Sequence, residues 1–329
     1  MGMITNELLS VSTKELEKEK GILTEIERYA IHDGPGIRSV IFLKGCPLRC
    51  EWCSNPETQQ KYIEMAYFED KCISCHRCVE NCPYNAITVV NGDMILDRTL
   101  CVENCFGKTE QFPCTVQCYP QARIAIGESM TVIEVYKEIL RDASFYEESG
   151  GGITISGGEP MFQANFVYSI LRYCKENWID TAIETSGAGS YEDYKLIAPY
   201  LDVLFIDLKH IDGDKYKEWT KHDNTNVLAN IQKLSKLAEE YEIKMYIRTP
   251  VIPGFNDSNE NINNIGNFVK EKCKGVQGIE LLPYHKLGRG KYVSIGKEYK
   301  LRDLEAPSDE RMDELNNILL DLGVNVYQF

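Results

Sequence analysis

Eleven of the thirteen cysteines in this 329-residue chain lie between Cys46 and Cys118. Metal ligands gather in short segments in this way, whereas a disulfide framework spreads over the whole fold, and disulfides are rare in cytosolic proteins. The N-terminus lacks the basic and then apolar layout of a signal peptide, and no apolar run is long enough to cross a bilayer. We therefore expect a cytoplasmic protein, without a membrane partner, whose cysteines bind metal.

Charge and composition narrow the class of partner. The formal net charge is −14, from 36 Lys and Arg against 50 Asp and Glu. Nucleic-acid binding requires a basic surface, so nucleic acid is not an expected partner. Hydrophobic residues make up 43% of the chain, enough for the core of one large domain or of two moderate ones.

The first group of cysteines is Cys46, Cys50 and Cys53, spaced C-x3-C-x2-C after the apolar run 39–43. Three thiolates this close together can hold three corners of a four-iron cluster, which four cysteines would close. The fourth iron then stays open, and an open position distinguishes a catalytic metal site from a structural one. The alternative is a zinc knuckle. It needs a fourth local Cys or His, and the next cysteine, Cys72, belongs to a second group.

The second group begins at residues 72–83 with C-x2-C-x2-C-x3-C-P, the run that bacterial ferredoxins use for four-iron clusters. A modified half, C-x3-C-x8-C-x3-C, follows at residues 101–118. In two-cluster ferredoxins the fourth cysteine of each half crosses to the other cluster. Carried over, this arrangement predicts Cys72, Cys75, Cys78 and Cys118 for one cluster, and Cys82, Cys101, Cys105 and Cys114 for the other. One or two structural zinc sites are the alternative.

Strand-like and helix-like segments alternate from Thr131 to the end of the chain. Together with the run at 39–43, strands are expected at 152–156, 181–185, 203–207, 243–248 and 278–282. Helices are expected at 131–143, 226–240 and 258–272, and from 307 onward. This alternation predicts a parallel sheet with crossover helices, either an α/β barrel or an open α/β sheet. A peripheral helix within residues 1–20, with a Ser12–Glu15 capping box, a short strand at 22–26 and an edge strand at 324–328 complete the prediction.

Each of the six expected strands ends in chemically notable residues. In α/β barrels, the chemistry lies at the C-terminal ends of the strands. After the cysteines of the first strand, these ends are residues 156–160, 184–187, 207–210, 248–254 and 282–285. They bring carboxylates, a Lys, an Arg and a His towards the open iron, which suits a zwitterionic ligand.

The cysteine motif and its flanks resemble a known family. Residues 33–38 read Asp-Gly-Pro-Gly-Ile-Arg and residues 54–57 read Ser-Asn-Pro-Glu, as in the glycyl-radical-enzyme activating enzymes of the radical S-adenosylmethionine (SAM) superfamily. The resemblance extends from about Gly21 to Phe329. It implies a partial (β/α)6 TIM-type barrel from residues 21–64 and 127–329. A small α+β ferredoxin-like domain with two four-iron clusters is inserted at 65–126, and residues 1–20 form an N-terminal extension.

The resemblance also implies a SAM site. Its residues are Trp52, Cys53, Ser54, Gly157, Gly158, Glu159, Glu184, Asp207, Leu208, Lys209, Arg248 and His285. Gly157 and Gly158 leave backbone groups bare for the amino group of the ligand, although a tight turn also explains them. A solvated strand end equally explains Asp207 and Lys209, and core packing explains Trp52. Glu184 stands where some relatives carry Asp, and its share in a monovalent-cation site is open.

The implied activity is that of an activase, a radical SAM oxidoreductase. A low-potential donor such as flavodoxin or ferredoxin reduces the Cys46/Cys50/Cys53 cluster, and SAM binds to the open iron. Cleavage of SAM gives a 5′-deoxyadenosyl radical, which removes a hydrogen from one glycine of a partner glycyl radical enzyme. The implied cofactors are one SAM-binding [4Fe-4S] cluster, two ferredoxin-type [4Fe-4S] clusters, SAM and a monovalent cation. We expect a monomer in an anaerobic organism.

Two other functions stay open. A radical SAM enzyme acting on a small molecule or another protein is disfavoured by the combined motifs at 33–38 and 282–285. A non-enzymatic iron-sulfur electron-transfer protein would leave the first three cysteines and the strand ends unexplained. The sequence does not identify the partner enzyme. Cys174 and Cys273 are expected to be buried thiols, and His32, His76, His210 and His222 to have ordinary structural or surface roles.

Overall fold

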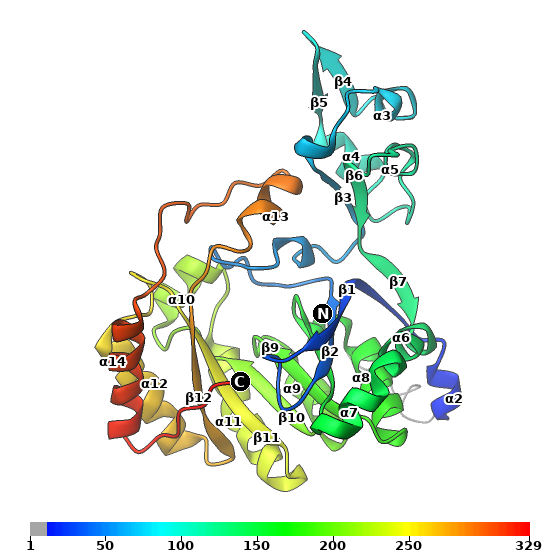
Figure 1. Ribbon diagram of the computed structural model, residues 1–329. Coiled ribbons are helices and arrows are strands. Elements are labelled where there is room, and N and C mark those ends of the chain that lie inside the picture. Colours follow the sequence, from blue (N-terminus) through cyan, green and yellow to red (C-terminus); the bar gives the residue numbers. More distant parts are fainter. Residues whose placement is uncertain (1–11) are drawn as a thin grey trace.

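The computed structural model describes residues 12–329. The main body contains an eight-stranded sheet in the order β12-β11-β10-β9-β8-β2-β1-β7 (Figure 1). Six neighbouring strands run parallel: β2 (Arg38–Leu43), β8 (Gly152–Gly157), β9 (Asp180–Thr185), β10 (Val203–Asp207), β11 (Lys244–Val251) and β12 (Val276–Pro283). β1 (Lys20–Ala30) and β7 (Glu128–Thr131) continue one edge in antiparallel pairing. The protein is thus an α/β protein with a large, mostly parallel sheet, as the alternation predicts.

Helices precede and connect the parallel strands and follow the last of them, and several begin where the sequence predicts. They are α6 (Val132–Ile139), α7 (Ala143–Ser149), α8 (Ala164–Glu176), α9 (Tyr191–Ile197), α10 (Gly213–Thr220), α11 (Thr225–Tyr241), α12 (Asn259–Lys272), α13 (Arg289–Ser294) and α14 (Asp309–Asp321). The hydroxyl of Thr131 accepts a hydrogen bond from the Glu134 amide, and the Glu134 carboxylate bonds back, which completes a capping box. Ser258 and Ser308 cap α12 and α14.

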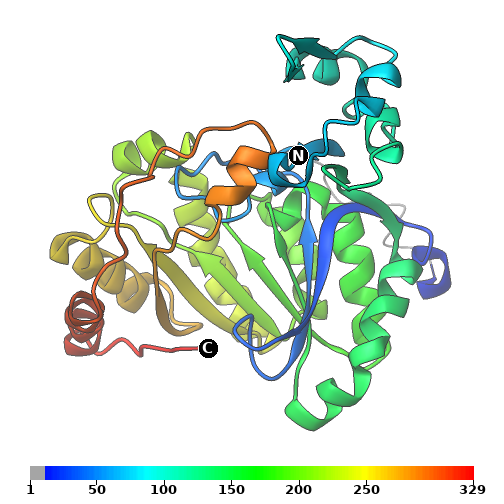
Figure 2. The same ribbon diagram turned by 45° about the horizontal axis from the view of Figure 1, so that its top comes forward.

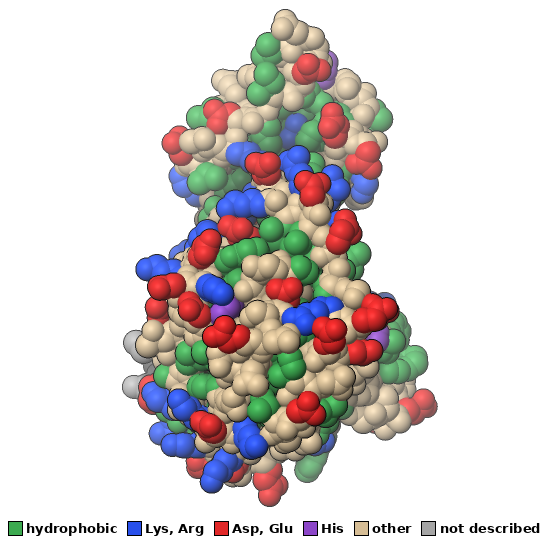
Figure 3. All heavy atoms as spheres, turned by 90° about the vertical axis from the view of Figure 1, so that its left-hand side faces the viewer, with side chains coloured by type: hydrophobic (Ala, Val, Ile, Leu, Met, Phe, Trp, Pro, Cys, Tyr) green, Lys and Arg blue, Asp and Glu red, His purple; other side chains and the backbone are tan. Residues whose placement is uncertain are grey.

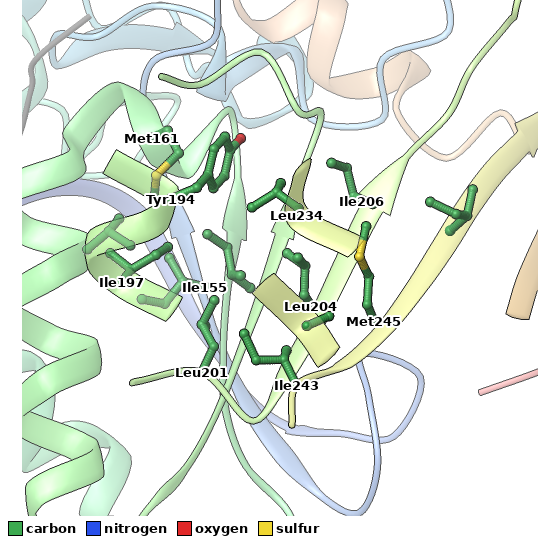
Figure 4. Packing of buried hydrophobic residues seen from close by; sticks show 14 of the residues in the cluster. Ile155, Met161, Tyr194, Ile197, Leu201, Leu204, Ile206, Leu234, Ile243 and Met245 are labelled. Atoms are coloured by element: carbon green, nitrogen blue, oxygen red, sulfur yellow. The ribbon is translucent and has the colours of Figure 1, made fainter. Parts of the chain in front are cut away.

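The main core lies between these helices and one face of the sheet. Leu204 and Ile206 of β10 and Met245 of β11 pack against Leu234 of α11 (Figure 4). Because neighbouring residues of a strand point to opposite faces, Phe205 lies on the other face, in a separate cluster. The opposite face is therefore left for other side chains, including those of the site described below.

Residues 64–126 form a lobe that projects from the main body (Figures 1 and 2). β3 (Glu64–Tyr67) pairs with β6 (Arg123–Ile126), and β4 (Ile87–Val90) pairs with β5 (Asp93–Leu96). The short helices α3 (Arg77–Glu80), α4 (Arg98–Asn104) and α5 (Pro113–Val116) complete it. Its small hydrophobic core includes Met65, Phe106 and Phe112.

The short 3₁₀ helices are η1 (Pro56–Thr58), η2 (Glu69–Lys71), η3 (Leu140–Asp142), η4 (Pro160–Gln163) and η5 (Ala198–Tyr200). Within residues 12–329, no helix has both the length and the apolar character that spanning a membrane requires.

Four element boundaries differ from prediction. α2 (Thr13–Leu16) keeps the Ser12–Glu15 capping box, but the chain is already extended at Lys20, and residues 1–11 of the predicted helix lie outside the described residues. The strand predicted at 22–26 is the eleven-residue β1, because it pairs with β2 on one side and β7 on the other. η3 interrupts the helix predicted at 131–143. The edge strand predicted at 324–328 is a single bridge between Val326 and Ile279.

Candidate active site

A cavity of about 710 Å³ collects residues from the C-terminal ends of all six parallel strands. This volume is typical of small-molecule pockets. Of the predicted site residues, its lining includes Cys46, Cys50, Trp52, Cys53, Ser54, Gly157, Gly158, Glu184, Asp207, Lys209, Arg248 and His285. Glu159 and Leu208 do not belong to this lining. The structure therefore brings together most of the residues that the sequence places at separate strand ends.

The three cysteines of the first group follow β2 on a loop that backbone hydrogen bonds hold in place. Gly45 bends the chain with a φ of 100°, and its amide donates to the carbonyl of Thr58 at 2.6 Å. The amide of Arg49 donates to the carbonyl of Thr220 at 2.7 Å, which ties the loop to α10. All three thiols face the 710 Å³ cavity.

Three cysteines with an accessible space beside them fit a four-iron cluster that keeps one iron open. Burial raises the pKa of all three thiols, that of Cys50 to about 12. Thiolates at these positions therefore need a bound cation, and metal binding would release their protons. Within residues 12–329, no three or more His, Cys, Asp and Glu side chains converge as joint ligands of one single metal ion; in a four-iron cluster, each cysteine would instead bind a different iron.

Arg248 of β11 is the centre of a charged network in the cavity. Its Nε donates to Oε2 of Glu280 at 2.7 Å, one Nη bonds to Glu184, and the other donates to the His32 carbonyl at 3.0 Å. The guanidinium also lies over the ring of Phe205, 3.9 Å from its centroid. Burial raises the pKa of the Glu184 carboxyl, although the charge of Arg248 opposes this. The two carboxylates and the ring fix the orientation of the guanidinium.

Lys209 is the second buried cation of the cavity, and within residues 12–329 it has a single ion-pair partner. Its ammonium forms an ion pair with Asp207. Burial opposes its charge, but Asp207 and the nearby Cys50 outweigh burial and raise the pKa of Lys209. The backbone carbonyl of Lys209 accepts from the Asn256 amide at 2.8 Å, so the strand end is also fixed. A positive charge thus stands close to the cysteine loop.

Gly157 and Gly158 are required by close backbone packing. Gly157 has a φ of 107°, and a Cβ there would lie 2.3 Å from the Leu43 amide nitrogen. A Cβ on Gly158 would lie 2.4 Å from the Gly45 carbonyl oxygen. Both also line the cavity. The tight approach of β8 to the cysteine loop accounts for these glycines, and the same absence of side chains leaves room for a ligand.

Glu159 and Leu208 have structural contacts. Glu159 is fully buried, and its carboxylate accepts hydrogen bonds from the Thr185 hydroxyl at 2.7 Å and the Ser186 amide at 2.8 Å. It thereby ties the loop after β8 to the end of β9. Leu208 is fully buried in the main core, and its amide donates to the Arg248 carbonyl at 2.9 Å.

Trp52 and His285 lie in the cavity wall. The indole of Trp52 packs against the ring of Phe255, with centroids 5.0 Å apart, and it also faces the cavity. The core-packing reading of Trp52 and its predicted ligand role are therefore compatible. Nδ1 of His285 accepts a weak hydrogen bond from the Leu287 amide at 3.4 Å.

The sequence reasoning missed His32, Glu280 and Phe329 as cavity residues. The Phe329 amide donates to Oε1 of Glu280 at 2.9 Å, and the Phe329 carbonyl lies 3.0 Å from Nδ1 of His32. Glu280 could have been found, because it pairs directly with Arg248 in the β11–β12 register and so lies on the same face. His32 and Phe329 carry no local signal, since their contact joins residues nearly 300 positions apart.

Comparison with known proteins gives the family. The sequence model of the radical SAM superfamily matches residues 72–264. The chain is 42% identical to the isethionate sulfite-lyase activating enzyme of Nitratidesulfovibrio vulgaris, over 90% of this chain and 95% of that protein. It is 38% identical to the 4-hydroxyphenylacetate decarboxylase activating enzyme of Clostridioides difficile, over 96% and 97%. The chain belongs to the glycyl-radical-enzyme activating enzymes of the radical SAM superfamily.

A further activating enzyme and a solved structure also resemble this chain. The (2S)-3-sulfopropanediol dehydratase activating enzyme of Klebsiella oxytoca is 38% identical, over 88% of this chain and 90% of that protein. Among solved structures, a domain of a pyruvate-formate lyase-activating enzyme from Bacteroides vulgatus is 28% identical, with a TM-score of 0.45, over 54% of this chain and 98% of that one.

In this activating enzyme the other eight clustered cysteines surround two small cavities in the projecting lobe. One cavity is lined by Cys72, Cys75, Cys78 and Cys118, and the other by Cys82, Cys101, Cys105 and Cys114. This is the grouping that the two-cluster ferredoxin arrangement predicts. Burial raises the pKa of Cys101 to about 11 and that of Cys114 to about 12, so thiolates there also need bound cations.

Proposed function

We propose that this activating enzyme binds SAM in the 710 Å³ cavity and uses it to place a radical on a glycine of a partner glycyl radical enzyme. The observation that carries this proposal is the shared cavity. Three cysteines that leave one iron open face the same space as two buried cations and their carboxylates. Family membership supports the reaction, and the shared cavity supports this location for it.

In this proposal, the residues of the chain hold the cofactors and orient SAM. Cys46, Cys50 and Cys53 would hold a four-iron cluster, which would supply the electron needed for cleavage of SAM. Lys209 has one ion-pair partner, so it is the freer cation for the carboxylate of SAM. Arg248 is already shared between two carboxylates, so we assign it a positioning role. The enclosing walls keep water from a reactive intermediate.

We further propose that the six parallel strands form a partial TIM-type barrel and that residues 65–126 are a ferredoxin-like insert. Support for the insert comes from its two four-cysteine cavities, which suit two further four-iron clusters. These clusters would accept electrons from a low-potential donor such as flavodoxin or ferredoxin. The partner enzyme stays open, because relatives named for different partners lie within 38–42% identity of this chain.

Anaerobic reconstitution tests the proposed function. The protein is loaded with iron and sulfide and mixed with SAM and dithionite, with a panel of the glycyl radical enzymes for which its relatives are named. We expect 5′-deoxyadenosine by chromatography and a glycyl radical signal by electron paramagnetic resonance in one partner. Cys46→Ala should abolish both, whereas Cys273→Ala, a buried thiol in the main core, should leave both intact.

Two outcomes would contradict the proposal. No 5′-deoxyadenosine from the loaded wild type would exclude SAM cleavage and favour an electron-transfer protein. Product formation without a radical in any partner would favour a radical SAM enzyme that acts on a small molecule or another protein.

A further inference from the structure

A second cavity, of about 990 Å³, lies outside the candidate active site, at the junction of the projecting lobe and the main body. β1 contributes Thr24 and Glu25, the lobe contributes residues 67–70 and 124–126, and the third wall is formed by residues around α13. Figures 1 and 2 place α13 beside the base of the lobe. We call this cavity the junction groove. No predicted site residue lines it.

The junction groove has apolar walls. Leu287 and Val293 are 81% and 71% exposed, and Phe68, Ile124 and Ile126 continue the lining. Large exposed apolar side chains that gather in a concave surface mark interaction sites more often than isolated ones do. Figure 3 shows the molecule narrowing between the lobe and the body, where hydrophobic, acidic and basic side chains lie together.

The junction groove is also acidic. Glu25, Glu69 and Asp70 are exposed, and none of them has an ion-pair partner within residues 12–329. Glu57 is about nine-tenths buried; its Oε1 accepts from Lys291 at 2.6 Å, but its Oε2 accepts no hydrogen bond from the described residues. A buried carboxylate oxygen without a donor is costly, and a bound cation would satisfy it.

The wall formed by α13 links the junction groove to the candidate active site. Lys291 Nζ also donates to Oδ1 of Asn55 at 2.7 Å, and Asn55 lines the SAM cavity. Gly288 packs so closely that a Cβ there would lie 2.9 Å from the carbonyl oxygen of Cys53. His285, two residues before Leu287, lines the SAM cavity itself. A protein bound in the groove would therefore contact the same segment that packs on the cysteine loop.

We propose that the junction groove docks a segment of the partner glycyl radical enzyme that carries Lys or Arg between apolar residues. The apolar walls would bind the apolar side chains, and the carboxylates would bind the cation by charge-assisted hydrogen bonds. An acidic partner would be repelled from the same surface. The proposal rests on the proposed activase function and names where the partner of that function binds.

Charge reversal tests the contribution of the carboxylates of the junction groove to docking. Glu25→Lys/Asp70→Lys is compared with Glu240→Lys/Glu271→Lys, which makes the same charge change at exposed acids away from the groove. With dithionite as the reductant, the rate of glycyl radical formation is measured over a range of partner concentrations. SAM cleavage is measured separately, in the absence of partner. We expect the groove variant to raise the KM for partner at least tenfold and to leave partner-free SAM cleavage unchanged. The control variant should match the wild type.

Two further experiments test the apolar walls of the junction groove and its preference for a cation. Leu287→Ser/Val293→Ser should raise the KM for partner, whereas Leu320→Ser, at an exposed leucine of α14, should not. Two labelled twelve-residue peptides, identical except for lysine or glutamate between leucines, are titrated into the reconstituted enzyme. By fluorescence anisotropy, the lysine peptide should bind at least tenfold more tightly, and the charge-reversed variant should lose this preference.

The contradicting outcomes are distinct from those of the proposed function. Equal affinity for both peptides, or equal partner KM in groove and control variants, would overturn the docking proposal while leaving SAM cleavage intact. Groove variants that fail only with a protein electron donor, and not with dithionite, would assign the groove to that donor. Failure of the wild type to cleave SAM would instead overturn the proposed function.

Discussion

Lys209 and Arg248 are two buried cations in one cavity that differ in their partners. Arg248 has two carboxylate partners and a carbonyl, whereas the ion pairs of Lys209 with the described residues are limited to Asp207. The sequence placed both residues at strand ends and predicted both as SAM ligands. It could not rank them, because the ranking depends on Glu280 and His32, which reach Arg248 only in the folded chain.

Replacing the ammonium of Lys209 should weaken SAM binding. A hydrogen bond to a charged group contributes about 1.5–3 kcal/mol, so Lys209→Met should raise the KM for SAM roughly 10- to 100-fold. Lys236→Met, at an exposed lysine of α11, is the control and should leave the KM unchanged. Initial rates of 5′-deoxyadenosine formation over a range of SAM concentrations measure both. An unchanged KM in Lys209→Met would remove Lys209 from the site.

His210 should make stability depend on pH. Burial, assisted by the charge of Lys215, lowers the pKa of His210 to about 4, below its ordinary value of 6.5. Between these values the unfolded chain binds the proton and the folded chain does not, so the free energy of unfolding should fall as pH drops from about 6.5 towards 4. Anaerobic urea unfolding from pH 8 to 5 measures this.

His210→Asn should flatten that dependence, whereas His222→Asn should retain it. The same slope in His210→Asn and the wild type would assign the dependence to other groups. The structural role predicted for His210 agrees with its burial and with its ring contact to Phe255, 5.2 Å between centroids.

At the scale of elements, local signals predicted most of the fold. The helices expected at 131–143, at 258–272 and from 307 onward begin close to the starts of α6, α12 and α14, and apolar runs located all six parallel strands. The boundaries that differ depend on pairing between distant segments. β1 extends to Ala30 because its second half pairs with β2, while β7 pairs only with its first residues, and no property of residues 27–30 alone indicates that.

The junction of β2 and β8 should tolerate no side chain at Gly157. Gly157→Ala would adopt a strained positive φ, at a cost of about 1–3 kcal/mol, and its Cβ would also clash with the Leu43 backbone. Gly290→Ala in α13 is the matched control, since a Cβ there meets no atom within 4 Å and alanine favours a helix. Urea unfolding should show a clear loss for the first variant and none for the second. Equal stabilities would contradict the packing described.

At the scale of the whole molecule, the eight lobe cysteines should act as two independent groups. If each four-cysteine cavity holds one of three four-iron clusters, Cys75→Ser should lower bound iron by roughly one third, and so should Cys105→Ser. The double variant Cys75→Ser/Cys118→Ser should lose no more iron than Cys75→Ser alone, because both residues line one cavity. Cys75→Ser/Cys105→Ser should lose roughly two thirds. Iron analysis after anaerobic reconstitution measures these ratios.

An uncrossed pairing, with Cys118 and Cys105 in one cluster, would instead make Cys75→Ser/Cys118→Ser lose roughly two thirds of the bound iron as well. The sequence predicted the grouping from ferredoxin spacing, even though its second half departs from that spacing. It did not predict the junction groove, because Glu25, Phe68, Ile126 and Val293 meet only when the lobe is placed on the body. Surfaces between segments so far apart in sequence leave no periodic pattern.

The position of Phe329 has a practical consequence. Its amide and carbonyl are bonded to Glu280 and His32 in the wall of the 710 Å³ cavity. A bulky group attached at Phe329 would therefore begin in that wall and crowd the cavity. Affinity tags for biochemical work are better inserted in an exposed loop away from this wall.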